Sequence, residues 1–299
     1  MDKVPVVAES RLAIWISATR PRTLSAAMAP VLVGSALAAQ AGHFNLWAAM
    51  LCLSFALLMQ IGANFANDYY DFLRGADTAA RVGPRRAVAA GLVSPDAMRR
   101  AMLAVFAAGF LVGLGLLARG GPWMLALGLA SIAGGIGYTG GPWPLAYLGL
   151  GDLFVFVFFG LIAVGGTYFI QAGDLTTQVI VAAIPVGLLA ANILVVNNYR
   201  DVETDTAANK RTLVVRWGRR AARGQFNGSL VVAFLIPLVL AVHFSHFGWL
   251  LPLLLVPWAW RQARRLRESQ TPAELIALLG ATGKLLASYA ALLAGGLLL

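Results

Sequence analysis

Two short windows of the sequence, residues 67–77 and 197–205, concentrate the side chains best suited to chemistry. Together they hold six of the chain's thirteen acidic residues. Each window begins with the pattern Asn-x-Tyr-x-Asp and follows a long apolar stretch. Carboxylates beside a membrane core are costly and are usually retained for a function. The two windows are therefore the first candidates for a binding or catalytic site.

The polar residues of each window are spaced so that they share one face of a helix. With about 3.6 residues per turn, the first stripe runs at i, i+3, i+4 and i+7 and contains Asn64, Asn67, Asp68 and Asp71. If the helix continues far enough, the second stripe runs at i, i+4 and i+8 and contains Asn197, Asp201 and Asp205. Mg²⁺ accepts carboxylate and amide oxygens and is often shared with substrate phosphates. Two such stripes facing each other predict a magnesium site for a phosphorylated substrate.

Basic residues follow each acidic window within a short loop. Arg85 and Arg86 follow the first window, and Lys210 and Arg211 follow the second. Their side chains could bind the outer oxygens of a diphosphate. A single aspartate near a helix end is often only a cap or a solvated charge. The repeated pattern, with cations after both windows, favours a shared site instead.

Residues outside the two stripes are weaker candidates for the same site. Asp77 is placed beyond the first stripe, where a loop charge is an alternative to a metal ligand. Tyr138, Tyr147 and Asp152 flank two apolar stretches on the side of the membrane where the windows lie, so they could reach the same cavity. Tyrosine is also common at membrane interfaces, so both readings stay open for the two tyrosines.

The composition places the chain in a membrane. Of its 299 residues, 59% are hydrophobic and only 12% are charged, and a bilayer core requires stretches of about 20 apolar residues. Nine such stretches occur, at 24–41, 45–66, 99–118, 121–138, 150–171, 177–197, 228–246, 248–260 and 279–299. The acidic windows follow the second and the sixth, as a duplicated helical unit around a shared cavity would place them. We predict an all-α membrane protein with nine transmembrane helices around a central cavity.

The net charge of +10 would suggest a nucleic-acid partner in a soluble protein, but here the basic residues sort by side of the membrane. With a cytoplasmic N-terminus, the cytoplasmic segments hold every lysine and arginine except Arg119 and Lys284. This is the positive-inside pattern, and a reversed orientation would break it. The sequence therefore predicts a multi-pass protein of the cell (inner) membrane, with a site facing the cytoplasm and no nucleic-acid partner.

No linker or low-complexity segment divides the chain, so we expect one polytopic domain over residues 1–299. Residues 1–23 mix charges with Ile14 and Trp15 and lack the pattern of a signal peptide. They predict a juxtamembrane surface segment. No phosphate-binding glycine loop, zinc-ligand spacing or nucleophile elbow is found in the sequence.

The motifs resemble those of the UbiA superfamily of intramembrane prenyltransferases, in particular the branch that prenylates 1,4-dihydroxy-2-naphthoate. The segments that carry the resemblance extend over nearly the whole chain: 20–24, 64–77, 83–86, 91–95, 138–142, 149–160 and 197–213. Two departures are small. Asn209 stands where glycine is expected, and Asp152 stands where many relatives have glutamate, so its carboxyl group is one methylene closer to the backbone.

The resemblance implies nine helices, with the aspartate motifs on the second and sixth, and a reaction that requires Mg²⁺. A polyprenyl group would pass from polyprenyl diphosphate to 1,4-dihydroxy-2-naphthoate, with loss of diphosphate and CO₂, to give demethylmenaquinol. The implied metal ligands are Asn67, Asp68, Asp71, Asp77, Asp201 and Asp205. The implied substrate contacts are Asn64, Arg85, Arg86, Asn197, Arg211, Tyr147 and Asp152. Catalytic roles fall to Asp71, Asp201, Lys210 and Tyr138, whose ring face could steady an allylic cation.

Two other functions remain open from the sequence. Within the superfamily, the acceptor could be 4-hydroxybenzoate, homogentisate or another aromatic compound, because acceptor choice depends on a few pocket contacts. In a different class, cation-coupled transporters also combine helical repeats with intramembrane carboxylates. Both windows here are predicted near one face of the membrane, which fits a one-sided active site better than alternating access.

Overall fold

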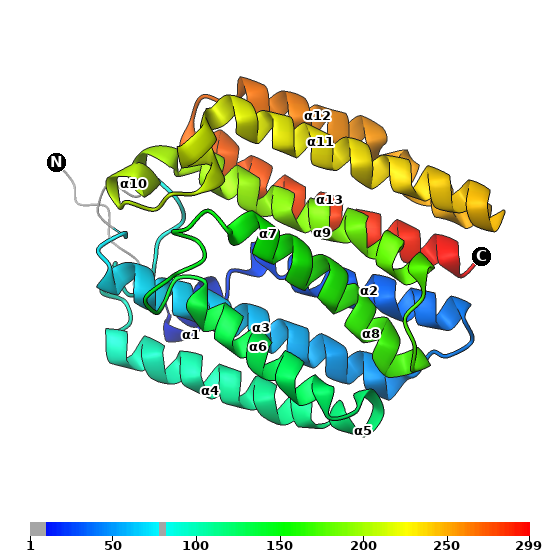
Figure 1. Cartoon of the computed structure of the whole chain (residues 1–299). Coiled ribbons are helices and arrows are strands. Elements are labelled where there is room, and N and C mark those ends of the chain that lie inside the picture. The colour runs from blue at the N-terminus through cyan, green and yellow to red at the C-terminus, as the bar shows by residue number, and fades with distance from the viewer. Residues whose placement is uncertain (1–9, 78–81) are drawn as a thin grey trace.

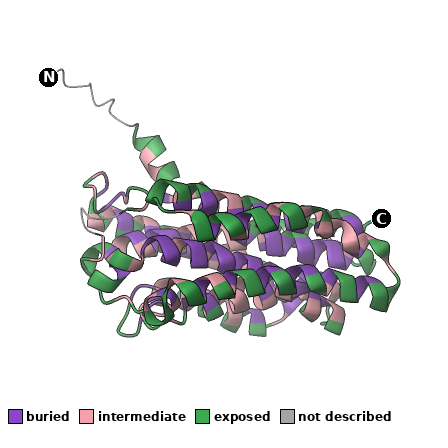
Figure 2. Ribbon diagram, turned by 90° about the horizontal axis from the view of Figure 1, so that it is seen from above, coloured by how far each residue is buried: buried purple, intermediate pink, exposed green. Residues whose placement is uncertain are grey.

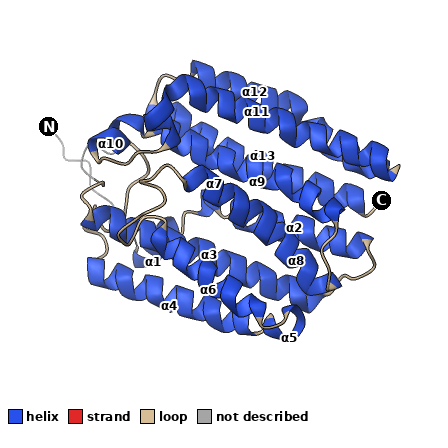
Figure 3. Cartoon of the chain, viewed as in Figure 1, coloured by secondary structure: helices blue, strands red, loops and turns tan. Residues whose placement is uncertain are grey.

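The computed structural model describes residues 10–77 and 82–299. Within these residues every regular element is helical, and no strand is present (Figure 3). The elements are α1 (Arg11–Ala18), η1 (Pro21–Thr23), α2 (Ser25–Gln40), α3 (Leu46–Leu73), α4 (Pro95–Leu114), α5 (Leu117–Gly120), α6 (Trp123–Gly137), α7 (Gly151–Val155), η2 (Phe156–Ile162), α8 (Ala163–Ala172), α9 (Thr177–Arg200), α10 (Val202–Ala207), α11 (Leu213–Phe244), η3 (Phe247–Leu255), α12 (Val256–Glu268) and α13 (Pro272–Leu297).

Helical elements occupy each of the predicted apolar ranges, but their lengths differ. In the described part of the chain, six are long and apolar enough to cross a membrane: α3, α4, the continuous run Gly151–Ala172, α9, α11 and α13. The helical segment Arg11–Thr23 meets α2 at an angle of 53°, and the two add a seventh span if they are counted as one. Helix α6 has 15 residues, about 22 Å at 1.5 Å per residue. The architecture is therefore that of a multi-pass helical membrane protein with six or seven candidate spans.

The N-terminal surface segment predicted at 1–23 is described only from residue 10 onward, so residues 1–9 lie outside the described residues. Helix α1 is capped by Ser10, whose hydroxyl accepts a hydrogen bond from the amide of Ala13. Leu12 and Ile16 are exposed on it. These exposed apolar side chains agree with a helix that rests on a membrane surface, and that placement stays a prediction.

The two acidic windows end their helices differently. Helix α3 continues past the predicted boundary at residue 66 and ends at Leu73, so the whole first stripe is helical. Helix α9 ends at Arg200, and Asp201 has non-helical dihedral angles. The short α10 then carries Asp205. The sequence places Asn197, Asp201 and Asp205 on one stripe only if the helix continues that far, and this condition is not met, because the chain turns at Asp201.

Helix α9 forms the centre of the bundle. In its apolar window 72% of the residues are buried, against 17% in α3, and its Val186, Leu189 and Val196 belong to the largest apolar core cluster. Buried residues concentrate in the interior helices and exposed ones on the outer faces (Figure 2). The ends of α3 and α9, together with α10, lie at the same end of the bundle (Figure 1). The fold thus places both acidic windows at one end.

Candidate active site

A cavity of about 300 Å³ lies inside the bundle, between α2, α3, α4, α6, the run from α7 to α8, and α9. Helix α3 presents one long face to it, through Cys52, Phe55, Ala56, Met59, Gln60, Ala63, Asn64, Asn67 and Asp71. Steps of one, three or four residues keep this face on one side of the helix. From Cys52 to Asp71 the face extends about 28 Å at 1.5 Å per residue. The cavity is therefore a long chamber rather than a small pit.

The end of the cavity nearest the acidic windows is polar. It is lined by Arg20, Gln60, Asn64, Asn67, Asp71, Arg86, Tyr138, Thr139, Asn197, Asn198 and Lys210. Residues from both windows and from the loops that follow them are in this set. The structure thus brings the two predicted half-sites together, although they are far apart in the sequence.

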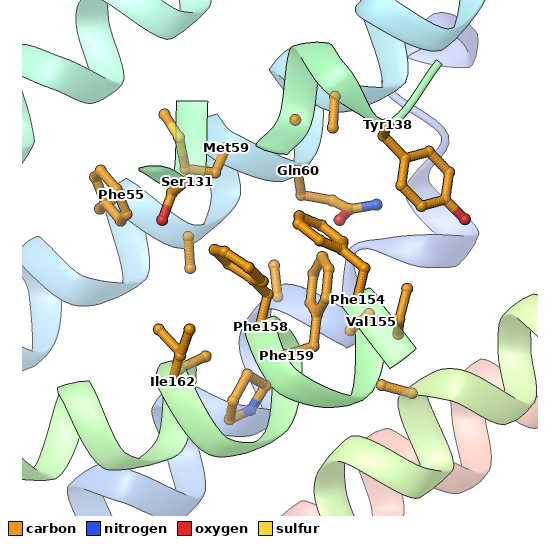
Figure 4. A pocket seen from close by; sticks show the side chains of 18 of the residues that line it. Phe55, Met59, Gln60, Ser131, Tyr138, Phe154, Val155, Phe158, Phe159 and Ile162 are labelled. Carbon is orange, nitrogen blue, oxygen red and sulfur yellow. The ribbon is translucent and has the colours of Figure 1, made fainter. Parts of the chain in front are cut away.

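The remainder of the cavity is mostly apolar, with Ser131 and Thr167 among its lining residues, and its most distinctive wall is aromatic. Phe154, Phe158 and Phe159 point into the cavity from α7 and η2, with Tyr138 near the polar end (Figure 4). The rings of Phe154 and Phe158 are stacked, with centroids 4.2 Å apart and an interplanar angle of 22°. An apolar, aromatic chamber behind a charged mouth suits a ligand with a charged head and an oily body.

A π-helical segment keeps this wall facing the cavity. The lining residues of this run come in pairs repeated every four positions: 154–155, 158–159, 162–163 and 166–167. A regular α-helix advances about 100° per residue, so a four-residue repeat would drift by about 40° each time. The π-helical turns of η2, from Phe156 to Ile162, are wider and reduce the drift. Such segments are frequent at functional sites.

Asp71 is the carboxylate of the first window that faces the cavity. Its Oδ1 accepts a hydrogen bond of 3.0 Å from the hydroxyl of Tyr147. Its Oδ2 lies 3.7 Å from Nη2 of Arg86, and the same guanidinium lies 3.4 Å from Asp77. Arg86 therefore stands between two aspartates at the cavity wall, and of these two only Asp71 is among the described residues that line the cavity.

The asparagines of the first window fix the backbone around the cavity. Oδ1 of Asn67 accepts a 3.0 Å hydrogen bond from the hydroxyl of Thr139. Asn64 donates from Nδ2 to the carbonyl of Thr19 at 2.9 Å, and its own carbonyl accepts a 3.3 Å bond from Arg20. These contacts anchor the segment before α2 and the loop after α6 to α3.

Asp68 is on the same helix but is turned away from the cavity lining. Its two carboxylate oxygens accept hydrogen bonds from the backbone amides of Ala87 and Val88, at 3.0 and 3.2 Å. A carboxylate satisfied in this way holds the turn that carries Arg86 in place. The proposed metal-binding role of Asp68 stays a prediction.

The second window carries its own charge pairs. Arg200 donates hydrogen bonds to both carboxylate oxygens of Asp201, at 2.7 and 2.6 Å, and to Oδ1 of Asn197 at 2.9 Å. Oδ1 of Asp205 lies 3.5 Å from Nζ of Lys210. Asn197 and Lys210 line the cavity, whereas Asp201 and Asp205 lie behind them.

Asp205 has the most perturbed environment of the second window. Burial raises the pKa of its carboxyl to about 6, although Lys210 favours the charged form; the negative charges of Asp201 and Asp71 act in the same direction as burial. Its Oδ2 is buried and accepts no hydrogen bond within the described residues. A carboxylate with an unused buried oxygen would gain from a nearby cation.

The remaining predicted residues fall into two groups. Tyr147 contacts Asp71 but does not line the cavity, and Asp152 accepts a 2.9 Å hydrogen bond from Gln225 beside a small second pocket that Tyr138 also borders. Arg85 and Arg211 have exposed side chains outside the cavity lining. Arg211 meets the site through its backbone amide, which donates to the carbonyl of Tyr147 at 3.2 Å.

The donor set fits Mg²⁺ shared with a phosphorylated ligand. Across residues 10–77 and 82–299, no three histidine, cysteine or carboxylate side chains gather closely enough to hold a metal ion alone. Mg²⁺ is usually bound through one or two carboxylates plus substrate phosphates rather than by an all-protein cage. Asn67 and Asp71 on the wall, and the unsatisfied oxygen of Asp205, would supply the protein's part of such a set.

Several lining residues were not identified from the sequence. Gln60 is four residues before Asn64 on the same helical face, so the 3.6-residue period extended backward would have found it. Arg20 belongs to the segment 20–24 that carries the family resemblance, and its left-handed backbone, with φ of 53°, marks an unusual turn. Phe154 and Phe158 lie in the segment 149–160 that carries the family resemblance, but their residue type gave no reason to single them out, because aromatic residues in an apolar helix usually face lipid or core.

Fold and site together define a helical membrane protein whose buried chamber has a charged, carboxylate-bearing mouth. The model of the UbiA prenyltransferase family matches residues 27–297. The chain belongs to this family, and the resemblance identified from the motifs is confirmed.

Relatives share this architecture over nearly their full length. The 1,4-dihydroxy-2-naphthoate octaprenyltransferase of Mycobacterium tuberculosis is 41% identical over 285 residues, which cover 95% of this chain and 96% of the relative. The protein of the same name from Escherichia coli is 39% identical, with 92% of each chain covered. A UbiA homolog from Archaeoglobus fulgidus, solved with DMAPP and Mg²⁺ bound, superimposes with a TM-score of 0.65 at 15% identity, over 94% of this chain and 99% of the homolog. At that identity the likeness concerns the fold.

Proposed function

We propose that the protein transfers a polyprenyl group from polyprenyl diphosphate to 1,4-dihydroxy-2-naphthoate, with Mg²⁺ as cofactor. Diphosphate and CO₂ are lost, and demethylmenaquinol is formed. The observation that carries the proposal is the convergence of both acidic windows on the polar end of a chamber that is otherwise apolar. The names of the relatives from M. tuberculosis and E. coli support this choice of acceptor.

The residues at the polar end suit the departure of a diphosphate. Mg²⁺ bound there would neutralise the diphosphate and make it a better leaving group. Asn67 and Asp71, with Asp205, would hold the ion. Lys210 and Arg86 line the same wall and would stabilise the charge that builds on the departing oxygens.

The apolar part of the chamber suits the second half of the reaction. Loss of diphosphate leaves an allylic cation, which water would destroy, and a chamber walled by apolar side chains excludes water. The ring carbon of the acceptor that bears the carboxyl group attacks this cation, and loss of CO₂ then restores aromaticity. Tyr138 and Phe154 line the cavity, and their ring faces would stabilise the cation.

We extend the proposal to the membrane topology. The protein would span the cell (inner) membrane nine times as one polytopic domain over residues 1–299, with a cytoplasmic N-terminus. The six long spans and the bent segment that includes α2 make seven. The short α6 and the η3–α12 segment would be the eighth and ninth spans. The polar end would then face the cytoplasm, where Mg²⁺ is available and the released diphosphate can leave into water. Cysteine-accessibility mapping of α12, whose Arg261 and Arg265 are exposed, tests this orientation.

An acceptor panel tests the reaction. Purified protein is incubated with Mg²⁺, a polyprenyl diphosphate and, in turn, 1,4-dihydroxy-2-naphthoate, 4-hydroxybenzoate and homogentisate. We expect product only with the naphthoate, one CO₂ released for each prenyl group, and no product when EDTA is present. Product with the benzoate alone would reassign the acceptor. Substrate-dependent ion flux in liposomes without prenyl transfer would replace the enzyme by a transporter.

A further inference from the structure

The loop between α6 and α7, residues 138–150, borders the polar end of the cavity through Tyr138 and Thr139 and contacts both acidic windows or the segments that follow them. At its start, Nε of Arg74 donates to the carbonyl of Thr139 at 3.1 Å. Nη2 of Arg74 donates to the carbonyl of Gly141. Arg74 is the C-terminal cap of α3, so the guanidinium joins the first window to this loop.

The far end of the loop is tied to the segment that follows the second window. Nη2 of Arg216 donates to the carbonyl of Leu148 at 2.9 Å, and its Nε donates to the carbonyl of Arg211 at 3.1 Å. The amide of Arg211 donates to the carbonyl of Tyr147 at 3.2 Å. One arginine from each side therefore holds the loop in place.

Tyr147 stands at the middle of these contacts. Its hydroxyl donates to Oδ1 of Asp71 at 3.0 Å. Two cations face its ring: Cζ of Arg74 is 5.2 Å from the ring centroid and Nζ of Lys210 is 5.8 Å from it. Both distances are within the range of a cation–π contact. Tyr147 thus touches the wall carboxylate of one window and the wall lysine of the other without lining the cavity itself.

We propose that Tyr147 and Arg74 are positioning residues that set the relative placement of Asp71 and Lys210. The inference rests on the proposed function, because it assigns these two groups to one magnesium diphosphate. The hydroxyl of Tyr147 donates a hydrogen bond to Oδ1 of Asp71 and so fixes the orientation of the carboxylate. The ring of Tyr147 holds the ammonium group of Lys210 in a preferred position. Arg74 holds the loop that carries Tyr147.

Two physical arguments support separate contributions from the two residues. Groups that orient a metal ligand through a hydrogen bond typically change metal affinity by about 10- to 100-fold when they are removed. The planar guanidinium of Arg74 binds two carbonyls and faces the ring of Tyr147, a combination that a lysine cannot reproduce. Membrane sidedness alone would account for an arginine at position 74, but it does not require these contacts.

Metal binding by the whole protein tests the role of Tyr147 without turnover. The melting temperature in detergent is measured against Mg²⁺ concentration, with a non-reactive polyprenyl thiolodiphosphate present, because a ligand that binds the native state raises it. We expect Tyr147→Phe, which keeps the ring, to raise the Mg²⁺ concentration at half-maximal stabilisation about tenfold. Tyr289→Phe is the matched control, since it removes a buried 2.9 Å hydrogen bond from a hydroxyl to the carbonyl of Ala233 in a residue that does not line the cavity.

The outcomes separate the inference from the proposed function. If the native protein gains no stability from Mg²⁺ with the thiolodiphosphate, the proposed function fails. If it does and Tyr147→Phe has the same midpoint as Tyr289→Phe, the role of Tyr147 is overturned while the function stands.

Hydrogen exchange tests the role of Arg74. In Arg74→Ala we expect faster amide exchange in residues 138–150 and a higher Mg²⁺ concentration at half-maximal stabilisation, which we call the Mg²⁺ midpoint. Arg100 is an exposed arginine of α4, and Arg100→Ala should change neither quantity. Arg74→Lys should restore at most part of both. Faster exchange with an unchanged midpoint would reduce Arg74 to a loop anchor and would contradict the positioning role.

Discussion

Gly160 of η2 and Gly187 of α9 meet backbone to backbone. A Cβ placed on Gly160 would stand 2.6 Å from the Cα of Gly187, and one placed on Gly187 would stand 2.7 Å from the carbonyl oxygen of Phe156. No side chain fits between the two helices at this point. The contact seats the π-helical segment against the central helix and so places the aromatic wall beside the polar end of the cavity.

Gly187→Ala should separate these helices. The backbone atoms that a methyl group would meet cannot rotate away, so we expect a loss of about 1–3 kcal/mol in stability, typical of overpacking. Thermal unfolding in detergent measures the change. Gly228→Ala in α11 is the control, because a Cβ there meets open space and alanine favours helix. Equal melting temperatures for the two variants would refute the account of this contact.

Asp71→Asn and Asp201→Asn should both abolish prenyl transfer, but for Asp201 the fold should also suffer. Arg200 pairs with Asp201 through buried side chains, and loss of one partner of such a pair costs about 3–5 kcal/mol. Turnover and thermal unfolding are measured on the same preparations. Arg219→Ala, which removes a largely exposed pair with Glu203, should cost less than about 1 kcal/mol. Full activity in both aspartate variants would remove the metal hypothesis.

Adjacent basic residues should differ sharply in their effects. Arg86 and Lys210 line the cavity, whereas the side chains of Arg85 and Arg211 are exposed. We expect Arg86→Gln and Lys210→Gln to lower kcat/KM for the polyprenyl diphosphate at least about 100-fold, the cost of removing one donor to a developing charge. Arg85→Gln and Arg211→Gln should stay within a few-fold of the native protein. If Arg85→Gln lost as much activity as Arg86→Gln, or Arg211→Gln as much as Lys210→Gln, the assignment of Arg86 and Lys210 as the diphosphate contacts would be contradicted.

Phe158→Leu should impair the use of the aromatic acceptor more than that of the diphosphate. The ring of Phe158 stacks on Phe154 and lines the cavity, and an aromatic contact is worth about 0.5–1.5 kcal/mol beyond its buried area. The acceptor KM should therefore rise about 2- to 10-fold at an unchanged KM for the polyprenyl diphosphate. A change confined to the diphosphate would place the prenyl chain, not the acceptor, against this ring.

Local patterns were sufficient to predict much of the fold and to predict that residues near both acidic windows border one cavity. The apolar stretches predicted where helices form, and the spacing from Asn64 to Asp71 correctly placed these residues on one helix. The same spacing could not predict that Asp68 turns toward the amides of Ala87 and Val88. A stripe at i, i+3, i+4 and i+7 is wide enough that a residue at its edge, here Asp68, can contact a different part of the protein from the other three. That part is the turn at residues 87–88, whose path the sequence does not specify.

Contacts between distant loops were beyond prediction for the same reason. Arg200 and Asp201 are adjacent in the sequence, but their spacing does not show that the helix ends between them or that Arg200 binds both carboxylate oxygens of Asp201. Arg74 and Arg216 each have a sufficient explanation in membrane sidedness, so the sequence gives no reason to expect that they hold the α6–α7 loop. Their hydrogen bonds to the loop could be identified only from the structure.

The central claim is that the two acidic windows hold one magnesium diphosphate between them. An experimental structure with Mn²⁺ in place of Mg²⁺ and a non-reactive polyprenyl thiolodiphosphate tests it most directly, because Mn²⁺ is located by its anomalous scattering. We expect a metal peak at the polar end, in contact with Asp71 and the diphosphate, with Lys210 on the diphosphate oxygens and the prenyl chain inside the apolar part of the cavity. Metal found away from both windows, or a diphosphate bound outside the cavity, would contradict the account.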